Sequence, residues 1–407
     1  MTSAGPQVRP SAGPQVRSSA GLPAGARSAK VGPLACPPER EARRWVRWSA
    51  GLLILLAAAL LLRADSVATG PQQASAFAST VASLSERGGY FDTDNLISNE
   101  RSYLQVIPDL RKRGVRGGAY IGVGPDQNFS YIGEVRPAVA YIIDVRRDNM
   151  LLHLLFKALF EVSASRTDYL AHLLGRPLPP AVDGWKQAPI DRLVGYFEKA
   201  PTSPDVVTAQ GKRLAEALRR SGMPLSSEDL STINAFHRRF IEEGLGLRFN
   251  STGRPPQAYY PTYRDLLLET DAAGAQTNFL ASEDAYQFVR SLQVRDRIIP
   301  VVGDISGPSA LQAIGREMAS RNEQLSAFYV SNVEFYLYGQ GAYTRFVANL
   351  RSVPRAKTAV LIRSVFGRFL FAARPGDAST SQLHDVGELI GGFEGGRYQS
   401  YGDLVAR

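Results

Sequence analysis

Glycines and an acidic residue that follow short apolar runs have the spacing of a nucleotide-type cofactor site. The run that begins at Ala119 stops at Gly122 and Gly124, and a second apolar run ends on Asp144. Glycines allow the backbone to turn sharply beneath a ligand, and an acid about twenty residues further on can accept hydrogen bonds from ribose hydroxyls. The third glycine of G-x-G-x-x-G is missing, so the motif needs support from the rest of the chain.

Two later apolar runs also end on polar residues. One ends on Asp304, and the other ends in a cluster that contains Ser331, Asn332 and Glu334. The carboxyl ends of parallel strands meet at one edge of a sheet, and ligands of open α/β folds bind there. The sequence therefore predicts that all of these polar residues lie at one edge and form one site.

Strands and helices alternate along the part of the chain that positions these residues. Apolar residues at helical spacing predict helices at 100–113 and 150–160, and short buried runs predict strands. The predicted strands are 119–122, 138–144, 297–304, 325–334 and 356–363, with closing strands at 369–373 and 398–405. This alternation predicts an α/β fold with a Rossmann-like sheet and helices on both faces.

A long stretch at about 161–290 breaks the alternation, because it contains helix patterns and no strand pattern. We expect a large helical insertion that caps the carboxyl edge of the sheet. Within it, the proline-rich loop at 254–263 holds three tyrosines, among them Tyr263. Contact with a substrate and packing against the cap helices are both open for this loop, and packing is favoured.

The segment 90–99 precedes the first predicted strand and is rich in Asp, Asn and Ser. It can fold over the end of that strand and line a site, or it can form Asx-type turns and a helix N-cap, which is the favoured interpretation. His153 lies in the apolar helix at 150–160, and a lone histidine on such a face is interpreted as a core residue.

The N-terminal region has three parts before the α/β domain at 89–407. Residues 1–44 are rich in Pro, Gly, Ala and Arg and are predicted to be disordered. Residues 45–63 contain an apolar run with flanking Trp and Arg, which favours a single-pass membrane anchor over a cleaved signal sequence or a buried helix. Residues 64–88 are interpreted as a linker. Arginines before the anchor predict a domain on the outer, periplasmic side.

The net charge of +9 does not predict a nucleic-acid partner. Residues 1–48 carry eight basic and two acidic residues, so this region alone has a net charge of +6 out of the total of +9. The remainder is only mildly basic, and nucleic-acid binding is not expected. The single cysteine, Cys36, excludes an internal disulfide and a cysteine-based metal site, and we expect no metal.

The four polar strand ends together resemble class I S-adenosylmethionine-dependent methyltransferases. The resemblance rests on GVGPD at 122–126, Asp144, Asp304 and the pair Ser331-Asn332. It implies that Gly122, Gly124, Asp144 and Asp304 hold S-adenosylmethionine, with Asp126 near the amino-acid end of this cofactor. Ser331, Asn332, Glu334 and Tyr263 are then candidates for the side of the methyl acceptor, whose identity the resemblance does not give.

The chain also resembles an uncharacterised bacterial family with the same Rossmann-like fold. This resemblance rests on the segments GVGPDQNFSYIGE, AYIIDVRRDN and VVGDISG. Three functions remain open at this stage. The first is a membrane-anchored protein that transfers methyl groups from S-adenosylmethionine. The second is a non-catalytic, membrane-tethered domain for binding or assembly. The third is an NAD-type nucleotide-binding protein, which the missing third glycine disfavours.

Overall fold

The computed structural model describes residues 75–253, 255, 257–369, 374 and 377–406. The sequence predictions for 1–44, for the membrane anchor at 45–63 and for the first part of the linker concern residues outside these ranges. Across the described ranges, no helix has the length and apolar character that a membrane crossing requires.

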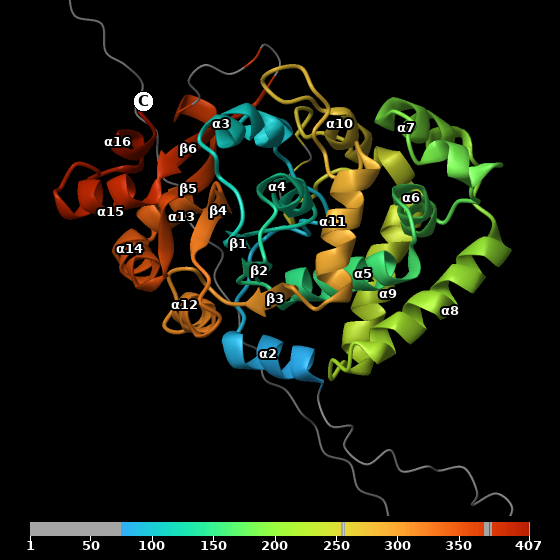
Figure 1. The fold of residues 1–407 in the computed structure, drawn as a ribbon, viewed down its shortest axis with the longest axis horizontal. Helices are drawn as coiled ribbons and strands as arrows, with labels where there is room; N and C mark the ends of the chain where they lie inside the picture. The colour runs from blue at the N-terminus through green and yellow to red at the C-terminus, as the bar shows by residue number, and fades with distance from the viewer. Residues whose placement is uncertain (1–74, 254, 256, 370–373, 375–376, 407) are drawn as a thin grey trace, which may run out of the picture. The chain divides into compact units, whose positions relative to one another are not determined.

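A six-stranded mixed sheet forms the centre of the domain (Figure 1). The strands are β1 (Ala119–Gly122), β2 (Val139–Asp144), β3 (Ile298–Val302), β4 (Leu325–Ser331), β5 (Arg355–Phe366) and β6 (Ser379–Asp385). Their order is β3-β2-β1-β4-β5-β6. The first five strands are parallel, and β6 pairs with β5 in the antiparallel direction. The predicted Rossmann-like α/β sheet is confirmed.

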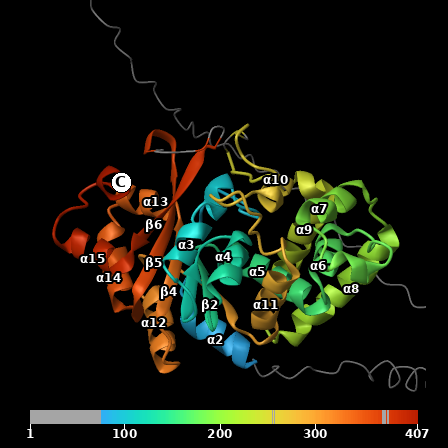
Figure 2. The same cartoon turned by 45° about the horizontal axis from the view of Figure 1, so that its top comes forward.

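Helices cover both faces of the sheet. Helices α4 (Gln127–Val135), α5 (Arg147–Val162) and α11 (Glu283–Val294) lie on one side of it. Helices α12 (Ala310–Ser320), α14 (Tyr343–Ser352) and α15 (Val386–Glu394) lie on the other (Figures 1 and 2). Strands buried from both sides are continuous apolar runs, as in β2 and β3, where nearly every residue is buried.

Among its described residues, the chain between β2 and β3 forms helices joined by loops and contributes no strand to the sheet. After α5 it forms α6 (Arg166–Leu174), η2 (Val182–Trp185), α7 (Ile190–Lys199), α8 (Pro204–Arg220), α9 (Ser227–Glu243), η3 (Gly244–Gly246), α10 (Tyr263–Leu268) and α11. Helices α6 to α9 lie beside the sheet, in green in Figure 1. The remaining elements are α2 (Ala76–Leu84), η1 (Arg101–Leu104), α3 (Ile107–Lys112), α13 (Val333–Gly339), η4 (Gly367–Phe369) and α16 (Tyr401–Val405).

Two predicted elements differ from the structure. The closing strand expected at 398–405 is helix α16, because Ser400 and Asp403 form a capping box and Tyr401, Leu404 and Val405 are buried at helical spacing. The other closing strand is predicted at 369–373, where residues 370–373 lie outside the described ranges. The strand that pairs with β5 at the sheet edge is β6, and its polar sequence contains no apolar run that would indicate it. The helix expected at 100–113 is divided into η1 and α3, and Pro108 stands in the first turn of α3.

Candidate functional site

A cavity of about 750 Å³ lies over the carboxyl ends of the five parallel strands. It is centred where the strand order reverses between β1 and β4, which is the position at which open α/β sheets bind ligands. The residues that follow the strands and line it are Val123, Gly124 and Gln127 after β1, Ile143 to Arg146 at β2, Gly303 to Ile305 after β3, Ser331 to Val333 at β4, and Phe366 and Gly367 at β5. Its volume is typical of small-molecule sites.

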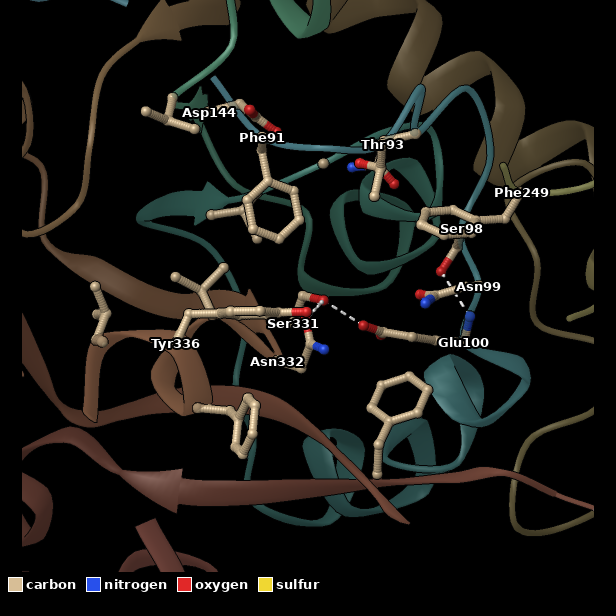
Figure 3. Close-up of a pocket in the computed structure, with 18 of the residues that line it drawn as sticks. Phe91, Thr93, Ser98, Asn99, Glu100, Asp144, Phe249, Ser331, Asn332 and Tyr336 are labelled. Carbon is tan, nitrogen blue, oxygen red and sulfur yellow. Dashed lines mark hydrogen bonds between the residues drawn. The ribbon is translucent and has the colours of Figure 1, made fainter. Parts of the chain in front are cut away.

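The segment before η1 forms one wall of this cavity (Figure 3). It contributes Tyr90, Phe91, Thr93, Asn95, Ser98, Asn99 and Glu100. Segment 90–99 therefore lines the cavity, as the less favoured of its two interpretations expects. The rings of Phe91 and Tyr336 meet edge to face with their centroids 5.0 Å apart. The loop at 254–263 adds Tyr259 and Tyr260.

Glu100 is a buried carboxylate that lines the cavity, and its side chain is directed toward Ser331 (Figure 3). Three hydroxyl groups donate hydrogen bonds to it: Tyr329 and Ser331 from β4, and Ser364 from β5. Burial raises the pKa of the Glu100 carboxyl, and the three hydroxyl groups oppose that rise. No basic side chain pairs with Glu100 among the described residues. Such an acid in a cavity is a candidate binding or catalytic group.

Asp144 stands at the end of β2 as predicted, but Arg146 is its partner. Asp144 Oδ1 accepts hydrogen bonds from the backbone N–H of Arg146 at 2.9 Å and from its Nε at 3.1 Å, and Oδ2 accepts one from the guanidinium at 3.0 Å. The same guanidinium donates to the carbonyls of Thr93 and Asp94. The acid that the sequence assigned to a ribose thus also fixes the wall formed by the 90–100 segment.

Asp304 lines the cavity after β3, and its Oδ1 accepts hydrogen bonds from the backbone N–H and the hydroxyl of Ser306. Nearby, Glu86 accepts hydrogen bonds from the backbone N–H groups of Asp304, Ser309 and Ala310. A protein carboxylate therefore already satisfies the start of α12. On this side of the cavity, the group that remains able to bind a ligand is the Asp304 carboxylate.

Hydrogen bonds from the side chain of Asn128 hold the glycine turn after β1. The amide nitrogen of Asn128 donates to the carbonyls of Val123 at 2.9 Å and Pro125 at 2.8 Å, and its Oδ1 accepts from Tyr120 at 2.8 Å. Gly124 has φ +81°, a conformation that favours glycine, and it lines the cavity. Gly122 has a different role, because a Cβ there would lie 1.9 Å from Asn128 Oδ1.

We expect Gly122→Ala to destabilise the protein by about 2–4 kcal/mol, because Asn128 must move and release its hydrogen bonds. Gly195→Ala is the matched control, since that helical glycine has open space where a Cβ would stand. It should stabilise the protein by about 0.5–1 kcal/mol. Urea unfolding of both variants measures the two effects. Equal stabilities for wild type and Gly122→Ala would contradict the packing described for this turn.

The structure brings Gly124, Asp144, Asp304, Ser331 and Asn332 together around the cavity. Ser331 adopts φ +53°, an uncommon conformation for a serine, at the point where β4 meets Glu100.

Three other candidates from the sequence lie away from the cavity lining. Asp126 and Tyr263 are buried and hydrogen-bonded to each other at 2.9 Å. Glu334 is buried against Arg363, with Nε and Oε2 2.5 Å apart. Each of these three side chains is buried and already bonded to another residue of the protein.

Sequence reasoning missed Glu100, Gln127 and Arg146. Glu100 was counted as the first residue of a helix, and nothing in its neighbours along the chain indicates burial. Gln127 stands three residues after Gly124 at the start of α4, so its helix-start position after the glycine turn was an available signal. Arg146 lies two residues after Asp144, and that short spacing was a signal for an ion pair at the strand end.

The fold and the cavity define a Rossmann-like α/β protein with a small-molecule-sized site at the switch point of its sheet. The chain belongs to the family described as a domain of unknown function (DUF7790), whose model matches residues 95–174 and 248–386, more than half of the chain. No curated protein matches the sequence. The match spans Glu100, Gln127, Asp144, Asp304 and Ser331, and it leaves out 175–247, where η2 and α7 to α9 lie.

Proposed function

We propose that this protein binds S-adenosylmethionine in the switch-point cavity and transfers its methyl group to a second molecule. The observation that carries the proposal is the cavity at the carboxyl edge, with Gly124, Asp144 and Asp304 at the ends of three successive strands. Membrane attachment through residues 45–63 is a separate part of the proposal, and it concerns residues outside the described ranges.

The side chains present fit an adenosine-type cofactor. A carboxylate has about four acceptor positions, and Arg146 takes three of those on Asp144. One hydrogen bond from a ribose hydroxyl can therefore be added without breaking the ion pair. Asp304 offers its Oδ2 oxygen, which has no hydrogen-bond donor among the described residues.

When bound, the cofactor supplies an electrophilic methyl group. What the protein supplies is position: the reacting groups must be held in line and kept from water. Phe91, Phe249 and Tyr336 form an aromatic wall that would reduce the contact of the reacting groups with water. Ser331 and Asn332 line the cavity and would face an acceptor. No acid–base triad is needed for this type of transfer.

Calorimetric titration of the full-length chain with S-adenosylmethionine and S-adenosylhomocysteine tests the proposal. We expect dissociation constants below about 1 mM for both, and at least tenfold weaker binding to Asp144→Ala, about 1.4 kcal/mol. Asp109→Ala, an exposed acid outside the cavity lining, should bind like wild type. No binding by folded wild type, or equal binding by Asp144→Ala, would overturn the assignment.

A non-catalytic binding domain is the second candidate, and one observation favours it. Arg146 joins Asp144 to the carbonyls of the 90–100 segment, so the acid of β2 has a structural role without any ligand. In that case S-adenosylmethionine fails to bind, and Asp144→Ala lowers stability because Arg146 loses its buried partner. Unfolding measured beside the titration separates the two candidates.

A further inference from the structure

Two hydrogen-bond acceptors line the cavity and are linked through the hydroxyl of Tyr329. One is the Glu100 carboxylate, 1% exposed, and the other is the side-chain oxygen of Gln127, 6% exposed. Gln127 Nε2 donates to the hydroxyl of Tyr329 at 3.3 Å, and that hydroxyl donates to Glu100. The three side chains therefore form one continuous network across β1 and β4.

The orientation of the Gln127 amide follows from this network. Tyr329 uses its only proton on Glu100, so its oxygen needs a donor, which the Gln127 amide nitrogen provides. The amide oxygen is then directed away from Tyr329. This oxygen is buried and has no hydrogen-bond partner among the described residues. A buried acceptor without a donor is costly, and a ligand with a donor group relieves that cost.

The charges around the cavity favour a cationic ligand. Its described lining contains three carboxylates, Glu100, Asp144 and Asp304, and one basic residue, Arg146, which already pairs with Asp144. Ten aromatic side chains also line it, and aromatic faces attract cations. Three of the large apolar side chains that are exposed, Tyr90, Tyr259 and Phe335, belong to this lining. The cavity thus combines a lining with more acidic than basic side chains and walls that are apolar and aromatic.

We propose that the cavity binds the ammonium group of an amine whose body is apolar. Glu100 is its counter-ion, and the Gln127 side-chain oxygen accepts a hydrogen bond from the same group. An ammonium group carries three donors and no acceptor, so it satisfies both acceptors at once. Gln127 begins α4 after β1 and Glu100 contacts β4 and β5, whereas Asp144 and Asp304 lie at β2 and β3. The inference goes beyond the proposed function and does not depend on S-adenosylmethionine binding.

Binding of 2-phenylethylamine to the full-length chain, without other ligands, tests the inference. The matched probes are 2-phenylethanol, which is neutral, and 3-phenylpropanoate, which is anionic. We expect calorimetry to give a dissociation constant below about 5 mM for the amine and values at least tenfold weaker for the alcohol. The anionic probe, 3-phenylpropanoate, should not bind. Equal affinity for amine and alcohol, or no binding of the amine, overturns the proposal and needs no variant.

Variants then assign the two acceptors. Glu100→Gln keeps the size of the side chain and should weaken amine binding at least tenfold while leaving the weak alcohol binding unchanged. Gln127→Leu should weaken amine binding about threefold to tenfold, by the loss of one hydrogen bond. Glu242→Gln, an exposed glutamate on α9, is the control and should bind the amine like wild type. Equal amine affinity for wild type and a folded Glu100→Gln protein overturns the assignment of Glu100. If that variant does not fold, equal amine affinity for wild type and Gln127→Leu overturns the placement of the ammonium group between the two acceptors.

Discussion

Asp126→Asn is expected to remove most of a loss of stability that the wild type undergoes between about pH 4 and pH 7. Asp126 is 4% exposed, and its Oδ2 accepts a hydrogen bond from Tyr263 at 2.9 Å. Burial raises the pKa of its carboxyl from 3.8 to about 7, and the hydrogen bond opposes this rise. The folded protein therefore favours the protonated acid.

The direction in which stability changes with pH follows from the raised pKa of the Asp126 carboxyl. Below the ordinary pKa of 3.8 the acid is neutral in both states, and the folded state has its full stability from this group. As the pH rises through about 7, the buried carboxyl must ionise, and this contribution is lost. A pKa difference of about three corresponds to about 4 kcal/mol. The Asn variant cannot ionise, so at pH 8 it should exceed the wild type by a value of this order.

Urea unfolding of wild type and Asp126→Asn from pH 4 to pH 8 measures the effect. The difference between the two curves isolates Asp126, because the raised pKa of Glu100 and the pKa of His153, lowered by burial to about 4, act in both proteins. Tyr103, Tyr169 and Tyr263 face Asp126 and stay neutral over this range. Asp109→Asn, an exposed acid, should follow the wild type. Parallel curves for wild type and Asp126→Asn would show that this carboxyl ionises freely in the fold.

The sheet was predictable from the sequence because parallel strands that are buried on both faces consist of continuous apolar runs. Residues 138–144 and 297–304 match β2 and β3 closely for this reason. Six of the seven residues of strand β6 at the sheet edge are polar, so no apolar run indicates it. No local sequence pattern predicts the order of the strands in the sheet, because that order depends on pairings between segments far apart in the chain.

The site was only partly predictable because a motif gives position along the chain and not the direction or partner of a side chain. Asp304 and Ser331 were found, since they follow directly from strand ends. Glu100 was not, because the hydroxyl groups that contact it stand on β4 and β5, more than 200 residues away in the sequence. Glu334 was assigned to the acceptor side, but helix α13 starts at Val333 and turns its side chain into the core.

Glu334→Leu is expected to destabilise the protein by about 3–5 kcal/mol, because it leaves Arg363 buried and charged without its partner. Both side chains are 1% exposed. Arg363 Nε lies 2.5 Å from Glu334 Oε2, Tyr343 donates to Oε1 at 2.9 Å, and the Arg363 guanidinium also contacts His384 Nδ1 at 2.9 Å. A guanidinium cannot lose its proton inside a protein, so it retains its full charge in the variant.

The reverse variant, Arg363→Met, should cost less than Glu334→Leu, because the remaining carboxylate can take up a proton and become neutral. The double variant Glu334→Leu/Arg363→Met should be more stable than Glu334→Leu alone, since apolar pairs of similar volume replace buried ion pairs at little cost. A double-mutant cycle by urea unfolding measures this coupling, and additive losses would contradict it. Because neither residue lines the cavity, the double variant should bind 2-phenylethylamine like wild type. Retained binding together with strong coupling assigns Glu334 to the core of the fold, and lost binding in a stable double variant would return it to the acceptor side.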